Sequence, residues 1–404
     1  MDALQIMDHL DRVRPALQPI VSAITHQVAG FEVLGRYEED GNWQSLKDFF
    51  LDTEIPVEFK NEVDAHLLSQ AVDHLLATEN PGFLSVNRSA SQLIEGDDEA
   101  FLRFLTEQEK KGFALNRFIL EVTEHDIEEE FESLNHLLRY YKTYGIRLAI
   151  DHIGGASSNI DRIRALRPDI LKIDASLTRS TNLENFQDIL HTLSVLARRI
   201  GAVLAYEMIE DANQLYFAWK NNGHYYQGFY LAKPSCQLEL GVTLDVTLSS
   251  QIQTFVSREK ELILQRIQFT EQCHHRLKKL SKWRDEGHAD DLAEEAKTIF
   301  DGHAFRLYIC DASGRQVSAN LRKKQGSWMR EEQVRGSNWA FRPYFLENMM
   351  RMQRTQHGRL SDLYADIETR EFVRTFSYPL SNDYFLFIDF SYDFITENDF
   401  LFMN

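Results

Sequence analysis

The sequence predicts a (β/α)8 TIM-like barrel, followed by a long linker helix and a smaller α+β domain. Up to about residue 240, short β-rich runs alternate with longer amphipathic stretches, as in parallel sheets. The stretch 245–283 is charged and contains neither Gly nor Pro, which favours one long helix. The remaining residues are rich in aromatics and alternate with period two. We therefore expect three segments: 1–242, a linker helix and spacer over 243–292, and a C-terminal domain over 293–404.

Eight β-rich runs account for the first segment, and most are separated by helical patterns such as Val63 to Leu76 and Phe186 to Ile200. Eight strands in about 240 residues match the size of a (β/α)8 barrel, and a doubly wound sheet is the alternative. The runs are Leu17 to Val21, Gly30 to Gly35, Phe83 to Asn87, Phe118 to Thr123, Arg147 to Ile153, Ile170 to Asp174, Val203 to Glu207 and Tyr225 to Tyr230.

The C-terminal segment reads as an antiparallel sheet with one helix. Arg306 to Asp311 and Gln316 to Asn320 flank the turn Asp311-Ala312-Ser313-Gly314 and predict a hairpin. Phe341 to Met352 has helical spacing. Three further runs complete the predicted sheet: Arg359 to Asp366, Phe372 to Tyr378 and Tyr384 to Phe390.

Composition narrows the function classes. The 404 residues contain 44 Lys and Arg against 62 Asp and Glu, a formal net charge of −18. DNA and RNA backbones reward clustered cations, so we expect no nucleic-acid partner. The sequence offers no apolar run of about 18 residues for a membrane span and no signal-peptide pattern at its start. We therefore predict a cytoplasmic protein without a membrane partner.

Polar residues interrupt nearly every predicted barrel strand. Isolated buried carboxylates are costly and must be paired or bound to metal, and the strand ends of a barrel are where barrel enzymes place catalysis. We therefore expect these side chains to converge. They are Glu32, Asn87, Glu121, Asp151, Lys172, Glu207 and Gln227.

Four carboxylates, an amide and a lysine suit a hard divalent cation such as Mg²⁺, Mn²⁺ or Ca²⁺. Two such ions side by side can activate water and clamp a phosphodiester. Phosphodiester hydrolysis is therefore the chemistry that the residues favour. The alternative is that some of the carboxylates form ion pairs with Lys172, Arg36 or Arg147.

Ordered motifs over about residues 5 to 240 make the resemblance specific. They are Gln18-Pro19-Ile20-Val21, Glu32-Val33-Leu34-Gly35-Arg36, Asn87, Glu121-Val122-Thr123-Glu124, Asp151-His152-Ile153-Gly154, Leu171-Lys172-Ile173-Asp174, Glu207-Met208-Ile209-Glu210 and Gln227-Gly228-Phe229-Tyr230. Their order and spacing resemble the EAL domains, the cyclic di-GMP phosphodiesterase family. The whole chain is similar to the YkuI type of EAL protein, whose C-terminal domain is PAS-like.

The resemblance implies a modified barrel that binds cyclic di-GMP at its open end and hydrolyses it to linear pGpG with divalent cations, Mg²⁺ or Mn²⁺, with Ca²⁺ as a non-productive occupant. Glu32, Asn87, Glu121 and Asp151 match ligands of one ion, and Asp151 and Glu207 those of a second. Glu32, Lys172 and Glu207 match catalytic positions. Lys172 would orient or deprotonate the attacking water, a role that suits a lysine whose pKa falls on burial. Gln18, Leu34, Arg36, Asp174 and Gln227 match positions around the dinucleotide, and Glu124 matches a residue that steadies a loop.

One departure from the family pattern concerns the second ion. The family's paired acids, Asp-Asp-Phe-Gly, appear here as Asp151-His152-Ile153-Gly154. An imidazole in place of a carboxylate disfavours Mg²⁺, whereas Mn²⁺ or Zn²⁺ tolerates nitrogen. His152 is therefore either a nitrogen ligand or a histidine beside a second site that never fills. We expect binding with weak or conditional hydrolysis; the alternative is an inactive cyclic di-GMP receptor.

The C-terminal segment resembles PAS-like and Cache sensor domains at Arg342-Pro343-Tyr344-Phe345, Asp362-Leu363-Tyr364 and Arg374-Thr375-Phe376-Ser377-Tyr378. Its aromatics read either as a packed core or as a pocket for a small ligand. This domain would regulate the barrel or form dimers, and the resemblance implies a homodimer.

Overall fold

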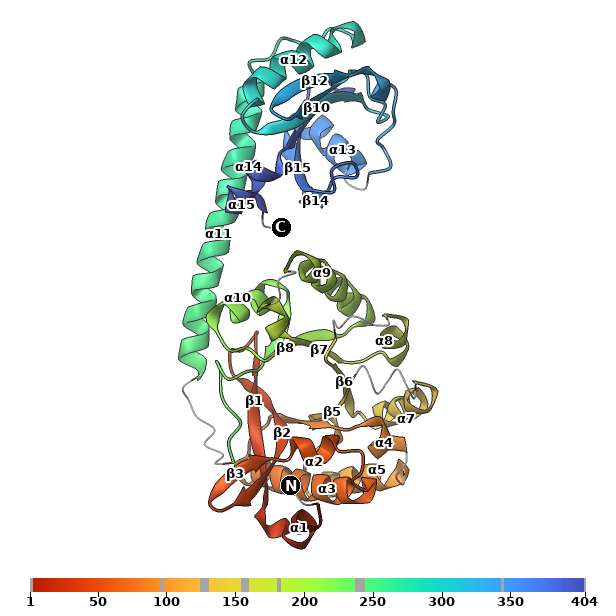
Figure 1. The fold of residues 1–404 in the computed structure, drawn as a ribbon, viewed down its shortest axis with the longest axis vertical. Coiled ribbons are helices and arrows are strands. Elements are labelled where there is room, and N and C mark those ends of the chain that lie inside the picture. Colours follow the sequence, from red (N-terminus) through yellow and green to blue (C-terminus); the bar gives the residue numbers. More distant parts are fainter. Residues whose placement is uncertain are drawn as a thin grey trace. The chain divides into compact units, whose positions relative to one another are not determined.

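The computed structural model describes residues 3–94, 98–123, 131–153, 160–179, 183–236, 244–342 and 345–402. The chain divides into two compact units, Met1–Phe255 and Val256–Asn404. Helix α11, Leu244–Leu277, begins in the first unit and continues into the second (Figure 1).

Within the described residues, eight strands of the first unit close into a barrel in the order β1, β9, β8, β7, β6, β5, β4, β2 and back to β1 (Figure 1). This confirms the barrel and rules out the doubly wound sheet. A ninth strand, β3, extends the sheet outside the ring by pairing with β2. The strands are β1 Val13–Ser22, β2 Val28–Glu39, β3 Asn42–Ser45, β4 Phe83–Asn87, β5 Phe118–Thr123, β6 Arg147–Asp151, β7 Ile170–Asp174, β8 Val203–Glu207 and β9 Gly223–Tyr226.

Strand β1 departs from the expected parallel sheet, because it runs antiparallel to both of its neighbours, β2 and β9. A short connection joins β1 to β2, and such a connection permits only an antiparallel pair. The register places Gln18 opposite Glu32. The barrel is therefore a modified one, as the resemblance implied.

Helices of the first unit follow most strands and cover the outside of the barrel (Figure 1). Within α3, the buried residues Val63, Leu67 and Leu68 recur at helical spacing and form the apolar face of that helix. The helices are α1 Ala3–Asp8, α2 Lys47–Leu51, α3 Val57–Ala77, α4 Ala90–Ile94, α5 Asp98–Lys110, α7 Phe131–Thr143, α8 Ile160–Leu166, α9 Leu183–Ile200 and α10 Ala212–Lys220.

An apolar layer fills the barrel interior. Since side chains of a strand alternate between its two faces, each strand sends every second residue inward. The cavity bordering this layer measures about 10 Å³, room for about one water, so the barrel is packed rather than open. The buried members of the layer are Ile20, Phe83, Ile119, Ala149, Ile170 and Ala205.

The second unit is an antiparallel sheet in the order β12, β11, β10, β16, β15, β13, with β14 also paired to β15. These strands are β10 Ala304–Asp311, β11 Asn320–Lys324, β12 Ser327–Glu331, β13 Arg359–Leu360, β14 Tyr364–Ala365, β15 Phe372–Pro379 and β16 Tyr384–Phe390. Its helices are α12 Ala289–Phe300, α13 Phe345–Thr355, α14 Tyr392–Thr396 and α15 Asp399–Phe402.

Two boundaries in the second unit differ from the expectation. The strand predicted at 316–320 begins at Asn320, because the hydroxyl of Ser318 accepts the Ile309 N–H (2.8 Å) that a ladder would have used. Helix α13 begins at Phe345, whereas the pattern predicted Phe341.

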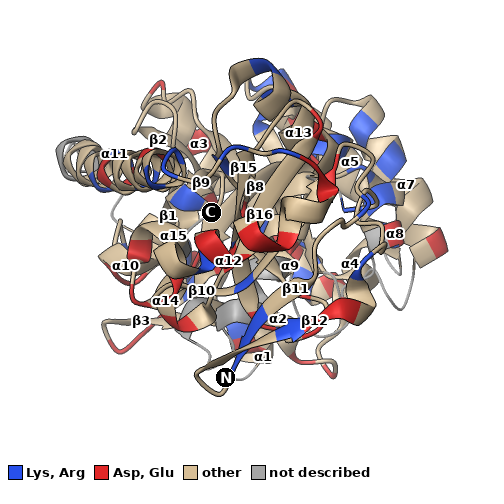
Figure 2. Ribbon diagram, turned by 90° about the horizontal axis from the view of Figure 1, so that it is seen from above, with Lys and Arg blue, Asp and Glu red and all other residues tan. Residues whose placement is uncertain are grey.

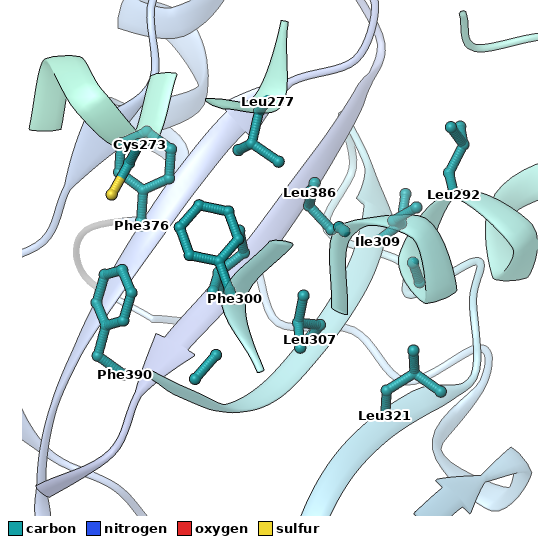
Figure 3. Packing of buried hydrophobic residues seen from close by; sticks show 14 of the residues in the cluster. Cys273, Leu277, Leu292, Phe300, Leu307, Ile309, Leu321, Phe376, Leu386 and Phe390 are labelled. Atoms are coloured by element: carbon teal, nitrogen blue, oxygen red, sulfur yellow. The ribbon is translucent and has the colours of Figure 1, made fainter. Parts of the chain in front are cut away.

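One face of this sheet packs against α11 and α12 (Figure 3). Cys273 and Leu277 of α11 and Phe300 of α12 lie over Phe376 and Leu386 of the sheet. In the first unit, Phe255 of the same helix packs against Tyr216 and Trp219 of α10, with ring centroids 5.2 and 5.9 Å apart. Helix α11 therefore belongs to both cores.

Charged residues of both signs are spread over many elements (Figure 2); α12, for example, carries four acids, at positions 290, 291, 294 and 295. Among the described residues, no helix combines the length and the apolar character needed to cross a bilayer.

Candidate metal centre

A polar layer lies directly on the apolar one. In each strand, the residue two positions closer to the mouth of the barrel also points inward, and it is polar. Ser85 follows Phe83, Glu121 follows Ile119, and Lys172 follows Ile170 in this way. The buried polar residues of this layer are Gln18, Glu32, Ser85, Glu121, Asp151, Lys172, Glu207 and Gln227.

Lys172 lies at the centre of this layer, and its ammonium contacts carboxylates from four strands. Its Nζ is 2.7 Å from Glu121 Oε2 and 3.0 Å from Glu207 Oε2. Glu32 Oε2 and Asp151 Oδ1 follow at 3.6 and 3.7 Å. One buried cation thus faces four acids, and the cluster keeps an excess of negative charge.

The pKa of Lys172 is opposite to our expectation. Burial alone would lower it, but the surrounding carboxylates, Glu121 and Glu207 first, raise the pKa well above its ordinary value. The prediction of a lysine whose pKa falls on burial is therefore wrong for this arrangement. Burial instead destabilises the ionised form of two of the acids: it raises the pKa of Glu121 to about 8 and that of Glu207 to about 7.

Glu32 is held by two amides. Asn87 Nδ2 donates to its Oε1 at 2.7 Å, and Gln227 Nε2 donates to its Oε2 at 2.6 Å. The same Gln227 nitrogen lies 3.2 Å from Gln18 Oε1, and Gln18 in turn donates to the Ala232 carbonyl at 3.4 Å. The two amides fix the orientation of the Glu32 carboxylate. Asn87 itself is exposed.

Ser85 is a site residue that the sequence reasoning missed. Its hydroxyl donates to Glu121 Oε1, while Lys172 holds the other oxygen. Ser85 precedes Asn87 by two residues and therefore shares its inward phase. That phase is the signal that could have identified it.

His152 lies at the edge of the layer, one residue beyond β6. Its Nδ1 is 2.9 Å from Asp151 Oδ2 and 4.0 Å from Glu207 Oε1. The hydrogen bond with Asp151 raises the pKa of His152 to about 9. Burial would raise the pKa of Asp151, but Lys172 and His152 together hold it well below its usual range.

The donor set fits a divalent cation. Ligand atoms of Asp151, His152 and Glu207 all lie within 4.8 Å of one another. Glu207 Oε1 is buried and has no hydrogen-bond partner in the described structure, a costly state that a cation would relieve. The Glu32 and Asn87 side chains add further oxygens, the ligands that hard cations prefer.

Three of the predicted positions that the structure describes lie outside this contact network. Leu34 and Arg36 share the strand face of Glu32 by period two, and Arg36 Nη1 donates to the Gly35 carbonyl at 2.9 Å. Asp174 ends β7 opposite Glu207 and accepts the Ser176 N–H at 2.7 Å. Glu124 lies outside the described residues.

Two family models match the chain. The EAL domain matches residues 1–234, and a domain described as an EAL-domain associated signalling protein domain matches residues 242–402. The two matches follow one another along the sequence.

A full-length relative has the same organisation. The EAL-domain containing protein YkuI of Bacillus subtilis (strain 168) is 42% identical over 407 aligned positions, covering 99% of each chain. Its crystal structure, in complex with cyclic di-GMP as substrate and calcium, matches with a TM-score of 0.91 at 41% identity, covering 99% of this chain and 100% of that one.

More distant relatives match a little over half of the chain. The probable cyclic di-GMP phosphodiesterase PdeG of Escherichia coli (strain K12) is 28% identical over 238 residues, 56% of this chain and 45% of its own length. The FimX EAL domain of Pseudomonas aeruginosa, solved with cyclic di-GMP, shares the fold with a TM-score of 0.52 at 20% identity over 60% of this chain and 99% of its own. The chain therefore belongs to the EAL-domain family, in its YkuI-type form.

Proposed function

We propose that this protein binds cyclic di-GMP at the mouth of its barrel and hydrolyses it slowly, or under particular metal conditions, to linear pGpG. The observation that carries the proposal is the acid excess around Lys172, where four buried carboxylates face one ammonium. The YkuI structure with cyclic di-GMP and calcium supports it, as do the EAL relatives named as probable cyclic di-GMP phosphodiesterases.

The buried acids would hold the cations. Glu32, Asn87, Glu121 and Asp151 would ligate one ion, and Asp151 and Glu207 a second. When bound, such ions polarise a phosphodiester and an attacking water. Mg²⁺ or Mn²⁺ would support turnover, and Ca²⁺ would support binding.

Lys172 would act through its positive charge. The four acids raise the pKa of Lys172 in the metal-free chain, which favours a role in which its ammonium donates hydrogen bonds. In our proposal it orients the attacking water and balances the carboxylates, while Glu32 and Glu207 complete the catalytic set.

The dinucleotide would lie on the polar layer and on the residues beside it. Arg36 presents a planar guanidinium that suits a phosphate, and Leu34 lies on the same strand face. Gln18, Asp174 and Gln227 would contribute the remaining contacts, and Glu124 would steady a loop beside them.

A receptor that binds without turnover is the second candidate, and His152 favours it. Its imidazole stands next to Asp151 and Glu207, where the family pattern has a carboxylate. Losing one ion of a two-metal centre would cost several kcal/mol of transition-state stabilisation and leave the other contacts intact.

The decisive experiment measures binding and turnover separately. Calorimetry with cyclic di-GMP in Ca²⁺ should give binding by the wild type and a large loss in a Glu32→Ala, Arg36→Ala double variant; undiminished binding would refute the site. Chromatography of pGpG with Mg²⁺ or Mn²⁺ then compares the wild type with His152→Asp. Faster turnover by His152→Asp supports impaired catalysis, whereas equal rates contradict it.

Four further expectations remain predictions of this proposal: a homodimer, a PAS-like fold with a small ligand in the C-terminal domain, a cytoplasmic location, and the absence of a nucleic-acid partner. Size-exclusion chromatography with light scattering tests the first, and ligand screening by thermal shift tests the second.

A further inference from the structure

We propose that Asp64 and Arg88 are positioning residues, whose buried ion pair holds Asn87 toward Glu32. The inference rests on the proposed function, which makes Asn87 and Glu32 part of a cation site, and deepens it by naming what fixes their geometry. The pair lies behind the polar layer, where the end of β4 meets the helices that cover it.

Arg88 directly follows Asn87, the last residue of β4. Since successive side chains of a strand point to opposite faces, Asn87 is directed at Glu32 while Arg88 is directed at the covering helices. The backbone N–H of Arg88 donates to the Glu121 carbonyl at 2.9 Å, so the pairing of β4 with β5 continues through this residue. A shift of Arg88 would therefore move Asn87 and disturb Glu121 on the neighbouring strand.

Two helices hold the guanidinium of Arg88, a residue that is 4% exposed. Its Nε lies 3.2 Å from Asp64 Oδ2, and its Nη1 donates to Asn61 Oδ1 at 2.6 Å. Asn61 and Asp64 are three residues apart on α3 and share one face of that helix. The guanidinium also lies over the Phe101 ring of α5, 4.0 Å from the ring centroid. The end of β4 is thus tied to both helices through one side chain.

The same acid fixes the start of α4. Gln92 Nε2 donates to Asp64 Oδ2 at 2.9 Å. The Gln92 Oε1 accepts the Ser89 N–H at 3.2 Å, and the Ser89 hydroxyl accepts the Gln92 N–H at 3.3 Å, a reciprocal pair that forms a capping box. The chain that follows Asn87 is therefore locked to α3 through Asp64, although Asn87 itself is exposed.

Stability alone does not explain a charged pair at this place. Burial raises the pKa of Asp64 although Arg88 opposes the change, so the surroundings disfavour the ionised carboxylate. Apolar residues of similar volume often replace a buried ion pair without loss of stability. Such residues lack direction, however, whereas charged hydrogen bonds define one geometry, and the groups of a functional site must be held to within about 0.5 Å. The place of the pair, immediately after Asn87, therefore favours a positioning role.

The test uses the full chain and two changes of the pair. Asp64→Asn removes the charge and keeps an acceptor for Gln92, whereas the Asp64→Leu, Arg88→Met double variant replaces the whole pair by apolar side chains. Asp73→Asn is the matched control, because it lies on the same helix and its carboxylate, 59% exposed, pairs with Lys111 at 3.2 Å. Thermal unfolding in chelator identifies the variants that fold as the wild type does.

Two readouts follow, both without nucleotide. Nuclear magnetic resonance of ¹⁵N-asparagine in chelator records solvent exchange of the Asn87 side-chain amide, assigned by its absence from Asn87→Asp; the Asp64 variants should exchange several-fold faster than the wild type. Mn²⁺ titration followed by electron paramagnetic resonance should show that they bind roughly tenfold more weakly. Asp73→Asn should match the wild type in both.

An unchanged exchange rate or an unchanged affinity in a folded Asp64 variant would overturn the inference, as would equal losses in Asp73→Asn. Failure of both Asp64 variants to fold would assign the pair to the stability of the barrel and overturn the inference as well. Absence of cyclic di-GMP binding by the wild type in Ca²⁺ would instead overturn the proposed function, and the amide exchange would still decide whether the pair positions Asn87.

Discussion

Each unit of the molecule buries a cation among carboxylates, but in different proportions. In the barrel, Lys172 faces four acids. In the second unit, Arg306 lies between Asp366 and Asp389, with Nε 2.5 Å from Asp389 Oδ2. The two clusters therefore share their chemistry and differ in their balance of charge.

The Arg306 cluster (Arg306, Arg322, Asp366, Glu368, Asp389) is satisfied from within, because its third acid, Glu368, lies 3.7 Å from Arg306 and is also paired with Arg322 at 2.5 Å. The hydroxyl of Thr375 donates to Asp389 Oδ1 at 2.5 Å. Backbone N–H groups of Glu368 and Thr369 donate to Asp366 Oδ2 at 3.2 and 3.1 Å. Although burial opposes it, Arg306 and these donors lower the pKa of Asp366.

The Lys172 cluster has more acid than its donors can stabilise. The pKa values of Glu121 and Glu207 are raised to about 8 and about 7, and one oxygen of Glu207 lacks a partner. Charge balance thus distinguishes a buried network that stabilises the fold from one that is suited to bind cations. The predictions below test that distinction.

The largest expected effect is at Arg306. Arg306→Met leaves Asp366 and Asp389 buried without their cation, which costs about 3 to 5 kcal/mol. Calorimetry of the full chain should show a much lower transition temperature for the second unit. A shift no larger than that of Arg351→Met, at an exposed position of α13, would contradict the importance of this pair.

The second-largest expected loss of stability comes from removing a single hydroxyl. Thr375→Val removes the donor to Asp389 Oδ1 and should cost about 1 to 3 kcal/mol, because it leaves a buried acceptor unsatisfied. Ser377→Ala is the matched control on the same strand: its hydroxyl is buried without a partner in the described structure. Denaturant unfolding should separate the two variants, and equal losses would argue against a satisfied network.

In the barrel, removing an acid should increase the free energy of unfolding, whereas the two substitutions above decrease it. Because burial raises the pKa of Glu121 to about 8, the folded chain must protonate this side chain near neutral pH, which costs stability. Glu121→Gln removes that cost and should stabilise the metal-free chain by about 1 kcal/mol, while it weakens stabilisation by added Mn²⁺. Thermal unfolding in chelator and then in Mn²⁺ measures both effects. Glu62→Gln, an exposed acid of α3, is the control, and a clear loss of stability in chelator would refute the imbalance.

The smallest effect is a dependence on pH. The pKa of Asp366 is lower in the folded protein than its ordinary 3.8, so the unfolded chain takes up a proton first as the pH falls. The stabilisation is complete above about pH 4 and is lost as the pH falls through the folded pKa. Acid unfolding of Asp366→Asn should show a shallower slope than the wild type; Asp383→Asn, at an exposed position, should keep the wild-type slope.

Much of the barrel site could be predicted because two short-range regularities suffice. Period two fixes which residues of a strand point inward, and parallel strands bring their carboxyl ends to one edge. Glu32, Glu121, Asp151, Lys172 and Glu207 therefore meet as expected. The direction of β1 could not be predicted in this way. It is antiparallel because of its connection to β2, not because of its own residues.

The remainder depends on distant partners. Arg306 meets Asp366 and Asp389 across 60 and 83 residues of sequence, and no local pattern specifies that meeting. The pKa of Lys172 depends on how many acids lie within 4 Å of its nitrogen, which only the closed barrel determines. Ser85 is a small residue of a buried strand, and its hydroxyl gains meaning only beside Glu121.

The place of His152 has a consequence for substitutions at this position. Asp151 is the last residue of β6, so its inward direction is tied to the sheet, whereas His152 is the first residue outside it. The side chain at position 152 can therefore change, from an imidazole to a carboxylate for example, without disturbing the pairing of β6 or the apolar layer below it.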